Sequence, residues 1–224
     1  KAPLRANELY WTGRALDHYE RGRWRQTPDR IKLIEQLPTR WINVPSFQVD
    51  QKRLTLQHLY LDSRGHDTLF RLGQAVAVSL PMSASAIPLR ITREGGLLYD
   101  WPGDLHYAVL STTNQPFLSE QATTPRVSLL SDNDRQRYLQ IPSVLVAPLR
   151  KYALRIVGEE KDSLKVASIL ESHLQRTFTY RLTQSQELAE SAIDPILYFL
   201  RQSKAGHCEY FSSALTLLLR AMDI

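Results

Sequence analysis

Residues 194–214 read DPILYFLRQSKAGHCEYFSSA, and this segment sets the architecture of the C-terminal third of the chain. Asp194-Pro195 predicts the start of a helix, because the aspartate can cap free backbone N–H groups and proline fits the first helical turn. We expect this helix to continue through residues 196–200 and the following connection to end at Gly206. A strongly apolar helix is predicted from Cys208 to Met222, with Cys208 in its first turn.

Cys208 is the sole cysteine and the candidate catalytic residue. Unpaired backbone N–H groups and the helix dipole at a helix start favour the thiolate, which is the nucleophilic form of cysteine. Gly206, two residues earlier, allows a tight turn with no side chain to crowd an incoming substrate. Spacing alone favours a packed core thiol instead, because free cysteine is among the most buried residue types. Cys208 shares one helical stripe with Phe211, Leu215, Leu218 and Met222.

Upstream of residue 150 the sequence predicts β-structure, since short runs rich in alternating or β-branched residues recur between turn signals. The expected strands are residues 9–11, 15–19, 54–61, 75–78, 88–93, 97–99 and 106–110. Turns are expected at residues 20–23 and 94–96, where glycine accepts a positive φ angle. Such spacing predicts an antiparallel sandwich or barrel. The uncharged segment 72–89 is interpreted as a buried strand followed by a polar loop, because prolines and serines interrupt it.

A change of pattern predicts a domain junction near residue 150. Residues 114–148 are expected to form loops, because they hold four prolines and the polar cluster 131–134. That cluster lacks the glycine and the distal glutamate of a calcium loop. We therefore predict a β-rich domain over residues 1–150 and a second domain over residues 151–224. In the second, Asp162 or Ser163 can cap a helix and residues 178–180 form a short strand, so the predicted fold class is α+β.

The composition, 43% hydrophobic and 23% charged over 224 residues, is typical of a folded globular protein. A single cysteine excludes an intrachain disulfide and a multi-cysteine zinc site. The net charge of +5 comes without a run of five like charges, so we expect no nucleic-acid partner. The densest basic stretch, residues 21–25, is expected to be a solvated hairpin face. The motifs HExxH, CxxC, GxSxG and GxGxxG are absent, so no metal, serine nucleophile or cofactor is expected.

Four stretches of the chain resemble the bacterial transglutaminase-like superfamily. Residues 194–214 are similar to its nucleophile region, in which glycine-aromatic-cysteine-glutamate is followed by an aromatic pair and small residues. Residues 10–24 (YWTGRALDHYERGRW) resemble the segment that opens the extracytoplasmic part of the membrane-anchored, TgpA-type subgroup. Residues 138–142 (YLQIP) and 178–180 (FTY) resemble stretches that lie between these two. The four matches occur in the expected order.

The resemblance implies a papain-like Cys-His-Asp acyl transferase or hydrolase with Cys208 as its nucleophile. An antiparallel β-sandwich-like domain would precede the helical first part of a papain-like or transglutaminase-like core. The thiolate would attack a carboxamide of a protein or peptide substrate, such as a glutamine side chain, and ammonia would leave. An amine or water would then resolve the thioester. The resemblance also implies a parent protein anchored in the membrane, with this part on the outer face of the bacterial cytoplasmic membrane.

The chain departs from the family pattern after Cys208. In this superfamily the catalytic histidine and aspartate follow the cysteine by some tens of residues, but here only 16 residues follow it and none is histidine. His207 is no base for Cys208, because adjacent helix residues point about 100° apart. We therefore expect a chain that stops before the catalytic sheet and is inactive by itself. The last helix would lack its usual partner, which predicts self-association through it or packing onto the β-rich domain.

Two alternatives remain open from the sequence. The same triad would serve a cysteine peptidase or amidase, in which water rather than an amine accepts the acyl group. The other alternative is a non-catalytic binding or scaffold module of the cell envelope, with the β-rich domain as its working part.

Overall fold

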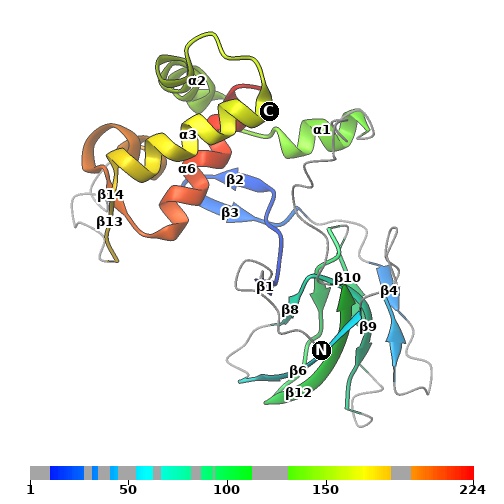
Figure 1. Ribbon diagram of the computed structural model, residues 1–224. Coiled ribbons are helices and arrows are strands. Elements are labelled where there is room, and N and C mark those ends of the chain that lie inside the picture. Colours follow the sequence, from blue (N-terminus) through cyan, green and yellow to red (C-terminus); the bar gives the residue numbers. More distant parts are fainter. Residues whose placement is uncertain are drawn as a thin grey trace. The chain divides into compact units, whose positions relative to one another are not determined.

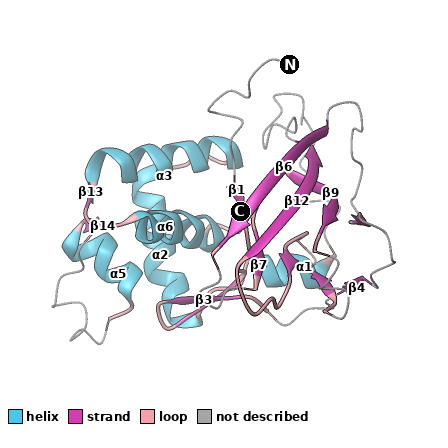
Figure 2. Cartoon of the chain, turned by 90° about the horizontal axis from the view of Figure 1, so that it is seen from below, coloured by secondary structure: helices cyan, strands magenta, loops and turns pink. Residues whose placement is uncertain are grey.

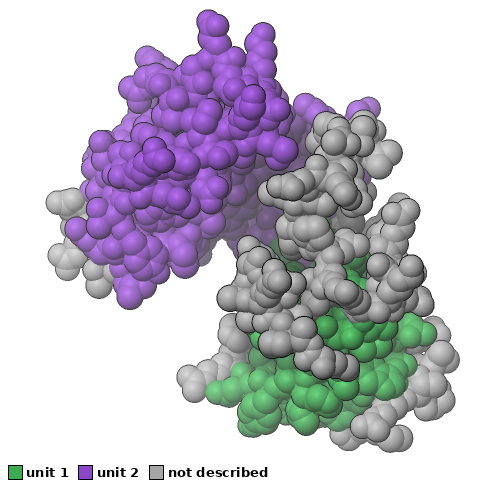
Figure 3. Space-filling view, in the orientation of Figure 1, with its two compact units in different colours: residues 1–15, 28–125 green, residues 16–27, 126–224 purple. Residues whose placement is uncertain are grey.

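The computed structural model describes residues 11–27, 32–34, 41–44, 54–62, 67–81, 87–92, 94–112, 131–182 and 193–224. The chain forms two compact units (Figure 3): unit 1 comprises residues 1–15 and 28–125, and unit 2 comprises residues 16–27 and 126–224. The junction expected near residue 150 therefore lies elsewhere, because residue 150 falls inside a continuous helix, Ser143–Val157. Unit 2 also takes in an N-terminal segment, which the sequence placed with the β-rich domain.

Unit 1 is built from antiparallel strands. They are β1 (Trp11–Thr12), β4 (Lys32–Ile34), β5 (Ile42–Asn43), β6 (Leu54–Leu61), β7 (Thr68–Leu69), β8 (Arg71–Leu72), β9 (Gln74–Ser79), β10 (Leu89–Ile91), β11 (Leu97–Leu98) and β12 (Leu105–Thr112). One four-stranded sheet has the order β4-β10-β11-β7 and another has the order β5-β9-β12-β6. Figure 1 labels β4 and β10 of the first sheet and β6, β9 and β12 of the second. A shorter pair joins β1 to β8.

The two four-stranded sheets of unit 1 share one apolar core, which confirms the sandwich-like prediction. Leu69, Leu89 and Leu97 come from one sheet, Val78 and Val109 come from the other, and all five are fully buried in the same cluster. The expected strand over residues 54–61 has those bounds in the structure. The predicted hairpin turn is also confirmed, since Gly95 has φ +78° and the Thr92 N–H donates to Gly96 O. The first expected strand lies partly outside the described residues, which begin at Trp11.

Unit 2 combines a β-hairpin with a group of helices (Figures 1 and 2). The hairpin is β2 (His18–Glu20) and β3 (Arg23–Arg25), and β13 (Thr179–Tyr180) pairs in parallel with β14 (Ala205–Gly206). The helices are α1 (Asp132–Tyr138), α2 (Ser143–Val157), α3 (Ser163–Thr177), α5 (Pro195–Tyr198), the π-helix η4 (Phe199–Ser203) and α6 (Cys208–Ala221). Among the described residues, no helix is long and apolar enough to cross a membrane.

Side-chain caps account for where several of these helices begin. Asp162 accepts from the Lys165 N–H at the start of α3, and Asp194 accepts from the Ile196 N–H at the start of α5. Both caps confirm the sequence prediction. The prediction of loops up to residue 148 is wrong for the described residues 131–148, because α1 and the start of α2 occupy most of them. Ser131 caps α1 by accepting from the Asp134 N–H. The polar cluster 131–134 is therefore a helix start, since short polar side chains satisfy the free N–H groups there.

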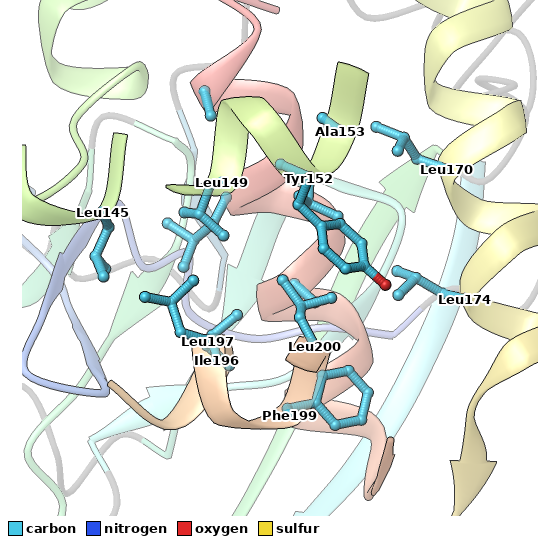
Figure 4. Packing of buried hydrophobic residues seen from close by; sticks show 14 of the residues in the cluster. Leu145, Leu149, Tyr152, Ala153, Leu170, Leu174, Ile196, Leu197, Phe199 and Leu200 are labelled. Atoms are coloured by element: carbon cyan, nitrogen blue, oxygen red, sulfur yellow. The ribbon is translucent and has the colours of Figure 1, made fainter. Parts of the chain in front are cut away.

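A second apolar core holds the helices of unit 2 together. Leu145 and Leu149 of α2 point toward Leu197 of α5 and Leu200 of η4 (Figure 4). Leu170 and Leu174 of α3 close the same cluster, as do Leu217 and Leu218 of α6. The covering for α6 thus comes largely from α2 and α3 of its own unit. On α6, Leu218 is buried, while Phe211, Leu215 and Leu219 are half-buried against this core.

Candidate active site

A short, tightly constrained segment leads the chain into Cys208. Lys204 takes a left-handed conformation with φ 47° and its N–H donates to Phe199 O, which ends η4. The next two residues form β14, so that the Thr179 N–H donates to Lys204 O and the Arg181 N–H donates to Gly206 O, each at 2.8 Å. One residue, His207, separates this strand from α6. Cys208 therefore begins a helix that follows a parallel strand pair almost at once.

Cys208 is the first residue of α6, which confirms its predicted place at the helix start, and it is exposed, unlike the packed core thiol that its spacing favoured. His207 caps the helix with extended backbone, and His207 O accepts from the N–H groups of Tyr210 and Phe211. The N–H groups of Cys208 and Glu209 have no intrahelical acceptor, because the residues four positions earlier lie outside the helix. Glu209 places a carboxylate in the first turn, where the helix dipole stabilises it.

The absence of a side chain at Gly206 leaves room for the neighbouring ring of Tyr210. A Cβ atom at Gly206 would lie 2.9 Å from Cγ of Tyr210 and 3.0 Å from its Cβ, so any larger residue would displace Tyr210. Gly206 is itself buried. The expectation that this glycine clears space for substrate is therefore corrected: the described contact is with Tyr210. Burial, together with the Glu209 charge, raises the pKa of the Tyr210 phenol.

A cluster of aromatic side chains packs against the first turn of α6. The Tyr210 ring lies 4.9 Å from the His207 ring and 5.5 Å from the Phe199 ring, both as centroid distances. Phe199 also contacts Phe211 at 5.3 Å and Phe178 at 4.7 Å. These rings come from α6, from η4 and from the end of α3, so the helix start rests on three elements of the same core.

Among the described residues, no side chain hydrogen-bonds to the Cys208 thiol. His173 Nε2 lies 3.2 Å from the Tyr152 hydroxyl, and Nδ1 lies 3.4 Å from the Thr177 hydroxyl, so both of its ring nitrogens face other groups. Burial and the Lys204 charge lower the pKa of His173. His207 packs edge-on against Tyr210. The described part of the chain thus presents an exposed thiol at a helix start, with no side chain hydrogen-bonded to it.

Several long-range contacts that hold α6 are not predictable from the sequence. The Trp24 indole N–H donates to Ser213 Oγ of α6 at 2.8 Å, and Arg220 Nη1 donates to the carbonyl oxygens of Asp17 and Gln140, each at 2.8 Å. Sequence patterns carry no signal for such pairs, because the partners are separated by up to 203 residues. Only the resemblance of residues 10–24 to a family segment pointed to this part of the chain.

Asp17 is a second buried group that connects the hairpin to the helices. It accepts from the Thr27 N–H at 2.7 Å and forms an ion pair with Arg137 of α1. Burial raises the pKa of the Asp17 carboxyl, but the hydrogen bond from Thr27 and the Arg137 charge outweigh it and hold the pKa below its usual value. No group of three or more metal-ligating side chains occurs among the residues that the structure describes.

Comparison with known proteins identifies relatives of this arrangement. Residues 150–224, which include Cys208, match the family model of the Transglutaminase-like superfamily. The crystal structure of the periplasmic domain of TgpA from Pseudomonas aeruginosa bound to ethylmercury matches 99% of this chain and 69% of its own, with a TM-score of 0.65 and 19% identity. A second crystal structure of the same domain gives a TM-score of 0.63 at 19% identity over 99% of this chain and 68% of its own.

A curated relative matches a shorter part of the chain. The uncharacterized protein YebA of Bacillus subtilis (strain 168) is 30% identical over 89 residues, which is 39% of this chain and 12% of YebA. The chain therefore spans only a small part of that relative. Together these matches confirm the α+β fold class and the transglutaminase-like resemblance of the C-terminal part.

Proposed function

We propose that this chain carries the nucleophile of a cysteine-dependent acyl transferase that acts on glutamine or other amide groups of proteins or peptides. The observation that carries the proposal is the position of Cys208, exposed as the first residue of α6 within the segment that matches the transglutaminase-like family. Exposure gives a substrate access to the thiol, and backbone N–H groups at a helix start are a general means of stabilising developing negative charge.

The chemistry follows from this position. The Cys208 thiolate attacks the carbonyl carbon of the amide, and the resulting oxyanion can be stabilised by the free backbone N–H groups at the start of α6. The C–N bond then breaks, the nitrogen takes a proton and leaves as ammonia, and a thioester remains on Cys208. A primary amine attacks the thioester, releases the thiol and forms a new amide. A histidine and an aspartate supplied beyond the described residues would move these protons.

We further propose an extracytoplasmic location for this part of a membrane-anchored parent. The support is the similarity to a periplasmic domain at the level of the fold. A cysteine peptidase or amidase is the second candidate, because the same thioester is hydrolysed when water replaces the amine. A non-catalytic envelope module is the third candidate.

Incorporation of a fluorescent primary amine into a glutamine-containing protein tests the proposal in the full-length protein. We expect incorporation that is lost in both Cys208→Ala and Cys208→Ser, because the hydroxyl is a far weaker nucleophile without the thiolate's charge. Glu171→Gln, an exposed substitution on α3, is the matched control and keeps wild-type activity. Release of ammonia without amine incorporation would identify the hydrolase, and turnover that survives Cys208→Ala would contradict a cysteine mechanism.

A further inference from the structure

The hairpin β2–β3 contacts the nucleophile segment on both sides of Cys208. The segment from Asp194 to Ser213 runs through α5, η4, β14 and the first turns of α6. Residues of the hairpin touch its beginning and its end. This arrangement lies entirely within unit 2.

On the α6 side the contact is a buried hydrogen bond. Ser213 is 4% exposed and follows Cys208 by five residues, and its hydroxyl accepts from the Trp24 indole N–H at 2.8 Å. The Trp24 ring also lies 4.9 Å from the guanidinium carbon of Arg220, at the far end of the same helix. Arg220 in turn donates to Asp17 O, directly before β2. Two points along α6 are thus tied to the hairpin.

On the α5 side the contact is made at the helix cap. The Tyr19 hydroxyl donates to the Asp194 carboxylate, with distances of 3.0 and 3.1 Å to its two oxygens, while the same carboxylate caps α5. A Cβ atom at Gly22, in the hairpin turn, would lie 2.7 Å from Cγ of Pro195. The hairpin backbone therefore packs directly on the first residue of α5.

The hairpin is itself held in place by Gln140. The Tyr19 N–H donates to Gln140 Oε1 at 2.8 Å, and Gln140 Nε2 donates to Tyr19 O at 3.1 Å. The side-chain amide therefore pairs with β2 as a neighbouring strand would. Gln140 O accepts from Arg220, which closes the network between the hairpin and α6.

We propose that β2–β3 is a positioning element for the nucleophile, in which Trp24 and Ser213 set the placement of the first turns of α6 and Tyr19 sets the placement of α5. This inference rests on the proposed function, because it gives the hairpin a role in the reactivity of Cys208. Trp24 and Ser213 act through the helix and not on the substrate, so they are positioning residues.

The rate at which iodoacetamide alkylates Cys208 measures this role directly, since the chain contains no other cysteine. The Cys208 thiol is already exposed, so loosening the start of α6 would hardly make it more accessible to iodoacetamide. A lower alkylation rate therefore reports that the start of α6 no longer enhances the reactivity of the thiol. We expect Trp24→Phe and Ser213→Ala each to slow alkylation about two- to five-fold at neutral pH, the range of a helix-terminus interaction. The double variant should react no more slowly than either single variant, because the two substitutions remove the same hydrogen bond, between Trp24 and Ser213.

Ser213→Thr keeps the acceptor hydroxyl and should restore the rate. The matched control is Trp101→Phe, which removes an indole N–H bond to Asp104 O in unit 1 and should leave the rate unchanged. Thermal unfolding identifies variants that are folded at the assay temperature. Folded Trp24→Phe and Ser213→Ala proteins that react at the wild-type rate would overturn the positioning role. A folded wild-type protein that reacts no faster than the same chain in urea would instead count against the proposed function.

Discussion

Two hairpins of this protein each have a glycine at positive φ in the turn, but the two glycines meet different surroundings. The turn of β2–β3 contains Gly22 at φ +77°, and the turn between β10 and β11 contains Gly95 at φ +78°. Among the described residues, a Cβ atom at Gly95 would meet only Arg71 Nη2, at 3.7 Å, whereas one at Gly22 would lie 2.7 Å from Cγ of Pro195. The two turns therefore share a left-handed glycine and differ in the room around it.

The surroundings differ because the hairpins pair differently. β10–β11 lies inside a four-stranded sheet and is held by strands on both sides. β2–β3 is a two-stranded sheet, and isolated hairpins are marginally stable. It is held instead by side-chain bonds to helices, through Tyr19, Trp24 and Gln140. A turn signal in a sequence predicts the hairpin but not the element on which the hairpin packs.

Gly22→Ala and Gly95→Ala test this difference between the two turns, and we expect the largest loss in the free energy of unfolding from Gly22→Ala. Both place alanine at a positive φ, which costs about 1–2 kcal/mol. Gly22→Ala also forces a methyl group onto Pro195, which adds about 1–3 kcal/mol of overpacking. We expect urea unfolding to show a loss of about 2–5 kcal/mol for Gly22→Ala and about 1–2 kcal/mol for Gly95→Ala. Equal losses would show that the hairpin turn is not pressed against α5.

The pH dependence of stability compares the two units through one buried tyrosine in each, Tyr19 in unit 2 and Tyr107 in unit 1. Burial and the Asp194 charge raise the pKa of Tyr19, and burial raises the pKa of Tyr107 in unit 1 to about 12. An unfolded tyrosine loses its proton near pH 10. The folded state keeps that proton to higher pH, so stability is full below pH 10 and falls above it, by about 1.4 kcal/mol per pH unit for each tyrosine.

Tyr19→Phe and Tyr107→Phe should each remove one such dependence. Urea unfolding between pH 9 and pH 11.5 measures it, with the wild-type protein as the reference. The loss from Tyr107 ends near pH 12, while the loss from Tyr19 continues to higher pH. A Tyr19→Phe protein with the wild-type slope would mean that Tyr19 is not held protonated by Asp194 and the surrounding core.

Local signals explain what the sequence predicted correctly. The alternation of residues 54–61 predicted β6 because a strand alternates between two environments along its length. Asp194-Pro195 predicted α5, and the position after Gly206 predicted Cys208 at the start of α6. Each of these depends on neighbours within a few residues. The solvated basic stretch is of the same kind, since Arg21, Arg23 and Arg25 are exposed.

Tertiary packing explains what the sequence did not predict. Pro142 and Pro148 pointed to loops, yet Pro148 lies inside α2. A proline inside a helix costs about 3 kcal/mol. The same helix buries Leu145, Leu149, Tyr152, Ala153 and Val157, and each large apolar side chain contributes about 1.5–3 kcal/mol when buried. Burial therefore outweighs the proline.

The candidate site was predictable to the same extent. Cys208 was predictable because its position depends on the helix that begins there. The contact of Gly206 with Tyr210 was not predictable, because it depends on how the Tyr210 side chain packs. Trp24 and Gln140 were not assigned to the site, because only the folded chain brings them to α6 and to β2. A junction placed near residue 150 could not anticipate a hairpin that joins unit 2 from the N-terminal end.

The central claim is that Cys208 forms the covalent bond to the substrate. Acid quenching of the full-length protein during turnover of a glutamine-containing peptide, followed by trypsin digestion and mass spectrometry, tests it most directly. The tryptic peptide covering residues 205–220 contains Cys208, and the account predicts that this peptide carries the acyl group as a thioester that hydroxylamine removes. Turnover with the acyl group on a different peptide, or with unmodified Cys208 throughout, would contradict it.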